Sequence, residues 1–153
     1  MFLLYLQIFC RVVIGLVFTI SFLGKAFHLS SFQRSILAFN ILPARFSRPA
    51  ALLFLSGEGA VVILVGVGGS LLGLAFVLAI LLLLVFSCAL LSVLIRKLQT
   101  SCNCFGPTEK QVSSADIWRN IGFLLCASSG FCTVVVIRNN QASPDVAAWG
   151  WQR

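Results

Sequence analysis

Charged residues are scarce in this chain. Lysine and arginine contribute 11 residues and aspartate and glutamate contribute four, so only 10% of the 153 residues are charged. A soluble domain carries about 25% charged residues. Hydrophobic residues make up 59% of the chain, and one small globule cannot hide so many apolar side chains from water. The composition excludes a soluble enzyme, and it also excludes a disordered chain, which needs low hydrophobicity.

The formal net charge of +7 does not indicate nucleic-acid binding. The basic residues lie between apolar runs, as they do beside bilayer spans, and they do not form a basic groove. We therefore predict an integral membrane protein that has the lipid bilayer as its partner and binds no nucleic acid.

Four apolar segments are long enough to cross a bilayer, whose hydrocarbon core of about 30 Å needs roughly 20 helical residues. The segments cover residues 1–24, 49–68, 71–95 and 117–137. The predicted fold is an all-α membrane protein, a four-transmembrane-helix bundle. Residues 1–138 would form one transmembrane domain, and residues 139–153 a short polar tail.

The connections between the predicted spans differ in kind. Gly68-Gly69-Ser70 is a tight, uncharged turn, so the second and third spans should form an antiparallel hairpin. Residues 25–48 form a longer loop, and residues 96–116 form a second polar loop. We predict a short interfacial helix in the first long loop, ending before Pro43 and with an apolar face made of Phe32, Ile36, Leu37, Phe39 and Ile41.

With four spans, both long loops lie on one face of the membrane and both termini on the other. The terminal face carries Arg138 and Arg153. The positive-inside rule then places the long loops on the cytoplasmic side of a bacterial inner (plasma) membrane. The basic residues on the long-loop face are Lys25, Arg34, Arg45, Arg48, Arg96, Lys97, Lys110 and Arg119.

Two cysteines one residue apart give the strongest chemical signal. Cys102 and Cys104 follow the third span, and Gly106-Pro107 ends any helix just after them. Two thiols at this spacing can close a small, strained ring, and strained disulfides are the labile, oxidising kind. As thiolates, the same pair is a ligand set for soft metal ions. We take Cys102 and Cys104 as the candidate catalytic pair.

Four further cysteines lie within the predicted spans, where buried cysteine usually behaves as a small hydrophobic residue. At 1.5 Å per residue, Cys126 lies roughly 14 Å and Cys88 roughly 10 Å below the loop face. Either could act as a resolving thiol for the loop pair. Cys10 and Cys132 lie nearer the other half of the bilayer and are weaker candidates.

Arg11 and Glu58 are the two charges predicted near mid-bilayer, roughly 15 Å and 14 Å into their spans. A lone charge at that depth costs at least a few kcal/mol, so it normally faces the bundle interior and finds a partner. We expect an Arg11–Glu58 pair, which would be either a structural clamp or a site for a polar headgroup, a quinone oxygen or a proton. The sequence requires no cofactor, and a quinone is the one candidate that this pair suggests.

Lys25 ends the first span and is the third member of this predicted intramembrane polar site. It could stabilise a nearby thiolate, or its ammonium could snorkel to the lipid headgroups. On physical grounds alone, snorkelling is favoured.

These residues together resemble the MauE/DoxX-like membrane proteins. The resemblance covers about residues 10–125, and the Cys-x-Cys-Phe-Gly string after a third span is its most specific part. The matching positions are Arg11, Gly15, Phe18, Gly24-Lys25, Phe32, Leu42-Pro43, Glu58, Cys102-x-Cys104-Phe105-Gly106 and Arg119-Asn120.

The resemblance implies a four-helix membrane protein associated with thiol–disulfide chemistry. MauE is linked to methylamine utilisation, where it is thought to help mature the disulfide-rich small subunit of methylamine dehydrogenase with a thioredoxin-like partner. It also implies that Arg11, Lys25 and Glu58 belong to a site. Disulfide chemistry belongs in an oxidising compartment, whereas the charge distribution places Cys102 and Cys104 in the cytoplasm.

The leading hypothesis is a membrane thiol–disulfide redox protein that exchanges electrons with a thioredoxin-like partner or supports disulfide maturation of a client. Two alternatives remain. The first is a soft-metal-ion transporter or binding protein that uses the same thiols, with Cys88 or Cys126 as further ligands; the leading hypothesis assigns no metal ligand. The second is a non-catalytic membrane assembly factor that only recruits a partner.

Overall fold

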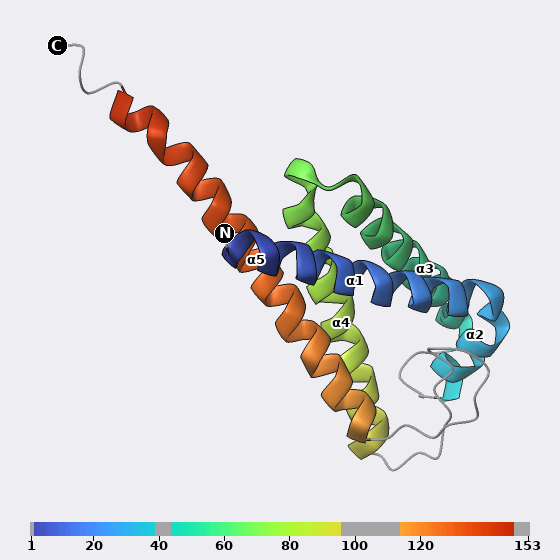
Figure 1. Cartoon of the computed structure of the whole chain (residues 1–153). Coiled ribbons are helices and arrows are strands. Elements are labelled where there is room, and N and C mark those ends of the chain that lie inside the picture. The colour runs from blue at the N-terminus through green and yellow to red at the C-terminus, as the bar shows by residue number, and fades with distance from the viewer. Residues whose placement is uncertain (1, 39–43, 96–113, 149–153) are drawn as a thin grey trace.

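The computed structural model describes residues 2–38, 44–95 and 114–148, and these are almost entirely helical. Four of the helices are long and apolar enough to cross a membrane, which confirms the predicted four-span bundle. The elements in chain order (Figure 1) are α1 (Phe2–Phe27), α2 (Leu29–Ala38), α3 (Ala44–Val67), η1 (Gly69–Leu71), α4 (Leu72–Ile95) and α5 (Ser114–Ala148).

Two helices extend at one end by five or more residues beyond the apolar segments that predicted them. α3 begins five residues before Pro49, which therefore lies inside the helix. α5 has 35 residues and continues past the predicted end of the span at residue 137. Its last turns project beyond the other helices in Figure 1. The predicted polar tail thus begins as a continuation of α5, because a helix that leaves the hydrocarbon keeps its own backbone hydrogen bonds.

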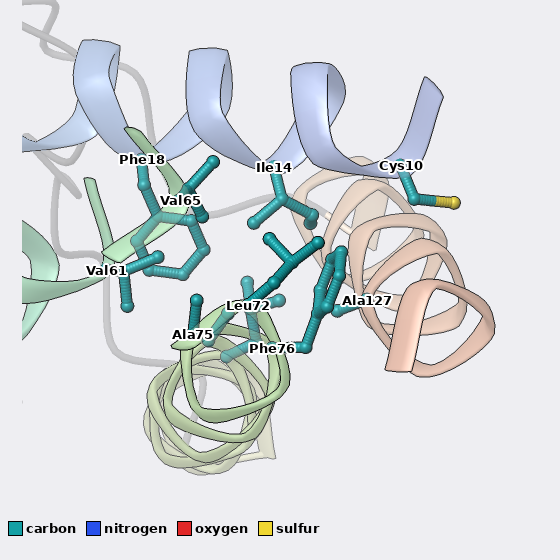
Figure 2. Close-up of a cluster of buried hydrophobic side chains, with 11 residues drawn as sticks. Cys10, Ile14, Phe18, Val61, Val65, Leu72, Ala75, Phe76 and Ala127 are labelled. Atoms are coloured by element: carbon teal, nitrogen blue, oxygen red, sulfur yellow. The ribbon is translucent and has the colours of Figure 1, made fainter. Parts of the chain in front are cut away.

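The four long helices pack in a ring in which α1 contacts α3 and α5, and α4 contacts the same two helices. Figure 2 shows Ile14 and Phe18 pointing from α1 into the bundle, toward Val61 and Val65 of α3 and Phe76 of α4. Only 17–28% of the residues in each span are buried inside the protein. Most apolar side chains therefore face outward, as expected where lipid is the solvent.

The turn between α3 and α4 confirms the predicted hairpin. Gly68 and Gly69 have φ values of 70° and 60°, a left-handed conformation that L side chains rarely adopt. The Gly68 amide donates to the carbonyl of Leu64 at 3.0 Å. A Cβ atom at position 68 would also lie 2.7 Å from the Arg11 guanidinium. The backbone conformation is therefore the reason for glycine here, whereas the Arg11 guanidinium is the far end of a flexible side chain and could shift.

α2 confirms the predicted short helix between the first two spans, and it packs against α3 and α1. Phe32 is buried, whereas Leu37 is exposed. The helix ends at Ala38 within the described residues. Phe39 and Ile41, which we predicted on its apolar face, lie outside the described residues.

The α1–α4–α5 contact leaves no room for a side chain at position 130. A Cβ atom on Gly130 would lie 2.6 Å from two ring carbons of Phe76 and 3.1 Å from the Cβ atom of Cys10, and both neighbours are buried. We predict that Gly130→Ala lowers the free energy of unfolding by about 1–3 kcal/mol through overpacking. Titration of the detergent-solubilised protein with sodium dodecyl sulfate measures this quantity.

Gly122 provides the matched control on the same helix, because a Cβ atom there meets nothing within 4 Å. Gly122→Ala should leave stability unchanged or raise it by up to about 1 kcal/mol, since alanine is the better helix former. Equal effects of the two substitutions would contradict the packing described here.

Candidate functional site

The inward face of α1 leads directly to a buried charge. Residues spaced three or four apart lie on one side of a helix. The buried residues of α1 have this spacing: Cys10, Ile14, Phe18, Ser21 and Lys25. Lys25 is only 2% exposed. Its side chain therefore points into the bundle, and the expectation that it snorkels to the headgroups is wrong.

Glu58 is the residue that receives the Lys25 ammonium. It lies on the buried side of α3 together with Val61 and Val65 and is 4% exposed. Lys25 Nζ forms an ion pair and hydrogen bond with Glu58 Oε1. Ser21 joins the pair, because its hydroxyl accepts from Lys25 Nζ at 2.9 Å and donates to Glu58 Oε1 at 2.9 Å.

Three phenylalanine rings surround the same ammonium. Lys25 Nζ lies 5.1 Å from the ring centroid of Phe32, 5.5 Å from that of Phe86 and 5.9 Å from that of Phe54. These rings come from α2, α4 and α3, so one cation contacts three helices besides its own. An ammonium over an aromatic face is stabilised by roughly 0.5–2 kcal/mol, most where water is excluded.

Arg11 does not pair with Glu58, so the predicted Arg11–Glu58 pair is wrong. Its Nε donates to the carbonyl of Val65 at 3.0 Å, and its Nη2 donates to the carbonyl of Gly66 at 3.0 Å. The last turn of a helix has backbone carbonyls without intrahelical partners. Arg11 thus binds the C-terminal end of α3 and holds it against α1, away from the Lys25–Glu58 pair.

The register of α1 against α3 explains this change of partner. Gly15 lies against Val65, and Gly59 lies against Phe22, as two antiparallel helices require. Arg11 therefore faces the end of α3, while Glu58 lies seven residues before Val65, or roughly 10 Å along the axis. The sequence-based depths place Arg11 and Glu58 at similar depths in the bilayer, because each depth is counted from the start of its own span without knowledge of how the spans are aligned.

Glu58 keeps one carboxylate oxygen without a protein partner. Among the described residues, Oε2 of Glu58 is the only buried side-chain oxygen or nitrogen that makes no hydrogen bond. Glu58 and Lys25 line a small cavity of about 40 Å³. A buried carboxylate oxygen without a donor costs about 1–3 kcal/mol or more, so Glu58 retains an unused hydrogen-bond acceptor.

Asn120 of α5 lines the same cavity. Its Nδ2 donates to Ser87 Oγ at 2.7 Å and to the carbonyl of Leu83 at 3.3 Å, both on α4. The amide thus joins α4 to α5 beside the ion pair. The cavity combines a carboxylate, an ammonium and an amide within an otherwise apolar bundle.

The predicted thiols are only partly placed. Cys102 and Cys104 lie outside the described residues. Cys88 is exposed on α4, and Cys126 is half-buried on α5. Cys126 packs against the apolar core that contains Cys10, and Cys10 Sγ lies 3.4 Å from Ser129 Oγ. Within the described ranges, no three histidine, cysteine, aspartate or glutamate side chains come together to hold a metal ion.

Several site residues were not predicted from the sequence. Ser21 had a readable signal, because it lies four residues before Lys25 and so shares its helix face. Asn120 entered only through the family resemblance. Phe54 and Phe86 had no signal, since they are two of 14 phenylalanines and belong to the site only through the packing of α3 on α4.

We predict that Lys25→Met lowers the free energy of unfolding by about 3–5 kcal/mol, because it leaves the Glu58 carboxylate buried without its cation. The double variant Lys25→Met, Glu58→Met should recover most of this loss, since neither charge then remains. A double-mutant cycle in mixed micelles measures the coupling.

Arg119→Gln is the control for a surface ion pair. Arg119 lies 3.2 Å from Asp116, and their side chains are 47% and 32% exposed. Exposed pairs contribute about 0–1 kcal/mol, so this substitution should change stability by no more than that. A Lys25→Met effect as small as that of Arg119→Gln would rule out the proposed importance of the buried pair.

Comparison with known proteins agrees with this architecture. Residues 3–133 match the family model described as methylamine utilisation protein MauE, which covers most of the chain and all of the site residues placed above. No curated protein and no solved structure gives a significant match. The chain, a multi-pass membrane protein with a buried Lys25–Glu58 pair between its first two spans, belongs to the MauE family.

Proposed function

We propose that this MauE-family protein is a membrane thiol–disulfide redox protein with Cys102 and Cys104 as its exchanging pair. The observation that carries the proposal is the Cys-x-Cys-Phe-Gly string directly after the third span, in a chain whose family match extends over residues 3–133. The partner is a thioredoxin-like protein or a client that acquires disulfides.

The proposed chemistry is thiol–disulfide exchange. In the oxidising direction, a client thiolate attacks the Cys102–Cys104 disulfide and forms a mixed disulfide, releasing one cysteine as a thiolate. A second client thiolate then attacks the mixed disulfide, so the client leaves oxidised and the pair becomes a dithiol. Two electrons pass from client to pair, and a thioredoxin-like partner with a disulfide would regenerate the pair by the same exchange.

The helices on either side of this pair in the sequence, α4 and α5, pack together. The chain leaves α4 at Ile95 and enters α5 at Ser114. Cys88 lies seven residues before Ile95, roughly 10 Å along α4, whereas Cys126 lies twelve residues after Ser114, roughly 18 Å along α5. Cys88 is therefore the better placed of the two proposed resolving thiols.

The family description also suggests a client to test. Methylamine utilisation requires methylamine dehydrogenase, whose small subunit is rich in disulfides. We propose a protein of this kind, with several disulfides that must form in the correct pairs, as the client class.

The redox proposal predicts that Cys102 and Cys104 cycle between dithiol and disulfide in cells. Acid quenching followed by alkylation and mass spectrometry should find both states. Cys102→Ser, Cys104→Ser should reduce client disulfide formation to the level of a deletion, because no exchanging thiol remains. Cys132→Ser, on the exposed side of α5, is the control and should retain full function. A pair that never oxidises, together with full activity of the double variant, would refute the proposal.

The charge distribution predicts that Cys102 faces the cytoplasm. In a variant with the four span cysteines replaced by alanine, a membrane-impermeant thiol reagent should label Cys102 only after the cells are permeabilised. Ser70→Cys in the exposed α3–α4 turn lies at the opposite end of the bundle. Introduced into the same background without Cys102 and Cys104, it should be labelled in intact cells. The reverse pattern would place Cys102 and Cys104 in the oxidising compartment.

A further inference from the structure

An apolar groove of about 530 Å³ lies between α2, α3 and α4 beside the Lys25–Glu58 pair. Its size is within the range of about 300–1,000 Å³ typical of small-molecule sites. Phe32 and Ile36 of α2 line it together with Ala89 of α4. Leu53 and Leu84 also line it and are exposed, so the groove opens on the lipid-facing surface.

The groove shares two walls with the cavity that contains Glu58. Phe54 and Phe86 line both spaces, and the same two rings contact the Lys25 ammonium. A molecule in the groove would therefore lie against the same two rings that contact the ammonium of the ion pair. The cavity of about 40 Å³ has room for a hydroxyl group or a water, but not for a ring.

The chemistry of the two spaces defines the molecule that fits them. Lys25 and Glu58 neutralise each other, so the site favours an uncharged headgroup. The unpartnered Glu58 Oε2 is an acceptor, so the headgroup must donate a hydrogen bond. The phenylalanine walls favour a planar ring, which stacks well on aromatic faces, and the groove favours an apolar chain that enters from the bilayer.

We propose that this site binds a quinol of the membrane, an isoprenoid-tailed ring with phenolic hydroxyl groups. One hydroxyl donates to Glu58 Oε2, the ring lies against Phe54 and Phe86, and the tail lies in the groove. A phospholipid fits less well, because its phosphate is an anion and would approach a carboxylate whose cation is already paired. Binding goes beyond the thiol chemistry proposed above and needs neither Cys102 nor Cys104.

The test measures binding of decylubiquinol to the full-length protein in detergent micelles by native mass spectrometry. The matched ligand is the dimethyl ether of decylubiquinol, which keeps ring and tail but cannot donate a hydrogen bond. We expect the ether to bind about tenfold more weakly, the effect of losing one hydrogen bond to a charged group. Equal binding of the two ligands would overturn the assignment of Glu58 Oε2 as the acceptor.

Two variants test the groove without altering the ion pair. Ala89→Phe fills the groove and should weaken decylubiquinol binding by tenfold or more. Val77→Phe adds the same ring to α4 at a position 38% exposed and outside the groove, and it should bind as the wild type does. Equal binding by both variants, or complete displacement of decylubiquinol by phosphatidylethanolamine, would refute the site.

The cysteine double variant separates this inference from the proposed function. Cys102→Ser, Cys104→Ser should bind decylubiquinol with unchanged affinity, because the binding residues lie in α2, α3 and α4. Loss of quinol binding in this variant would contradict the site described here. Retained binding together with unimpaired client oxidation would refute the thiol function while supporting the quinol site.

Discussion

The Lys25–Glu58 ion pair is the interaction on which the arrangement of the described helices depends. Hydrocarbon does not tolerate either charge alone, so the two side chains must meet, and α1 packs along α3 in a register that allows them to do so. Phe32, Phe54 and Phe86 surround the ammonium from α2, α3 and α4. One buried cation therefore connects four helices, and the apolar core around Ile14 and Phe18 continues along the same face of α1.

Arg11 and Glu58 are similar features in the sequence, each a single charge within an apolar span, yet they have different roles. Arg11 donates to carbonyl groups at the end of α3 and lies against Gly68, so it secures the hairpin turn. Glu58 pairs with Lys25 but keeps one oxygen unbonded beside a cavity. Arg11 thus satisfies two backbone carbonyl groups at a helix end, whereas Glu58 retains an oxygen that can still accept a hydrogen bond.

Much of the architecture could be predicted from the residues because it depends on local physical rules. About 20 apolar residues are needed to cross a bilayer, which is enough to locate four spans. Two glycines with left-handed backbone are typical of a tight turn, as at Gly68 and Gly69. The inward face of α1 was not predicted, although its helical spacing is present in the sequence: Ser21 and Lys25 are four residues apart on a stripe that includes Cys10. The thiol pair is also a sequence feature, recognised from its spacing alone.

The sequence by itself determined that this protein is a bundle of membrane helices with a few charges that must find partners. Only the tertiary structure decided which partners they have. Span boundaries place α3 from Pro49, but the helix begins at Ala44, and depth counted from a span end carries no information about register. Register follows from side-chain packing such as Gly15 against Val65. Because a shift of seven residues moves a group by roughly 10 Å, this register places Glu58 beside Lys25 and not beside Arg11.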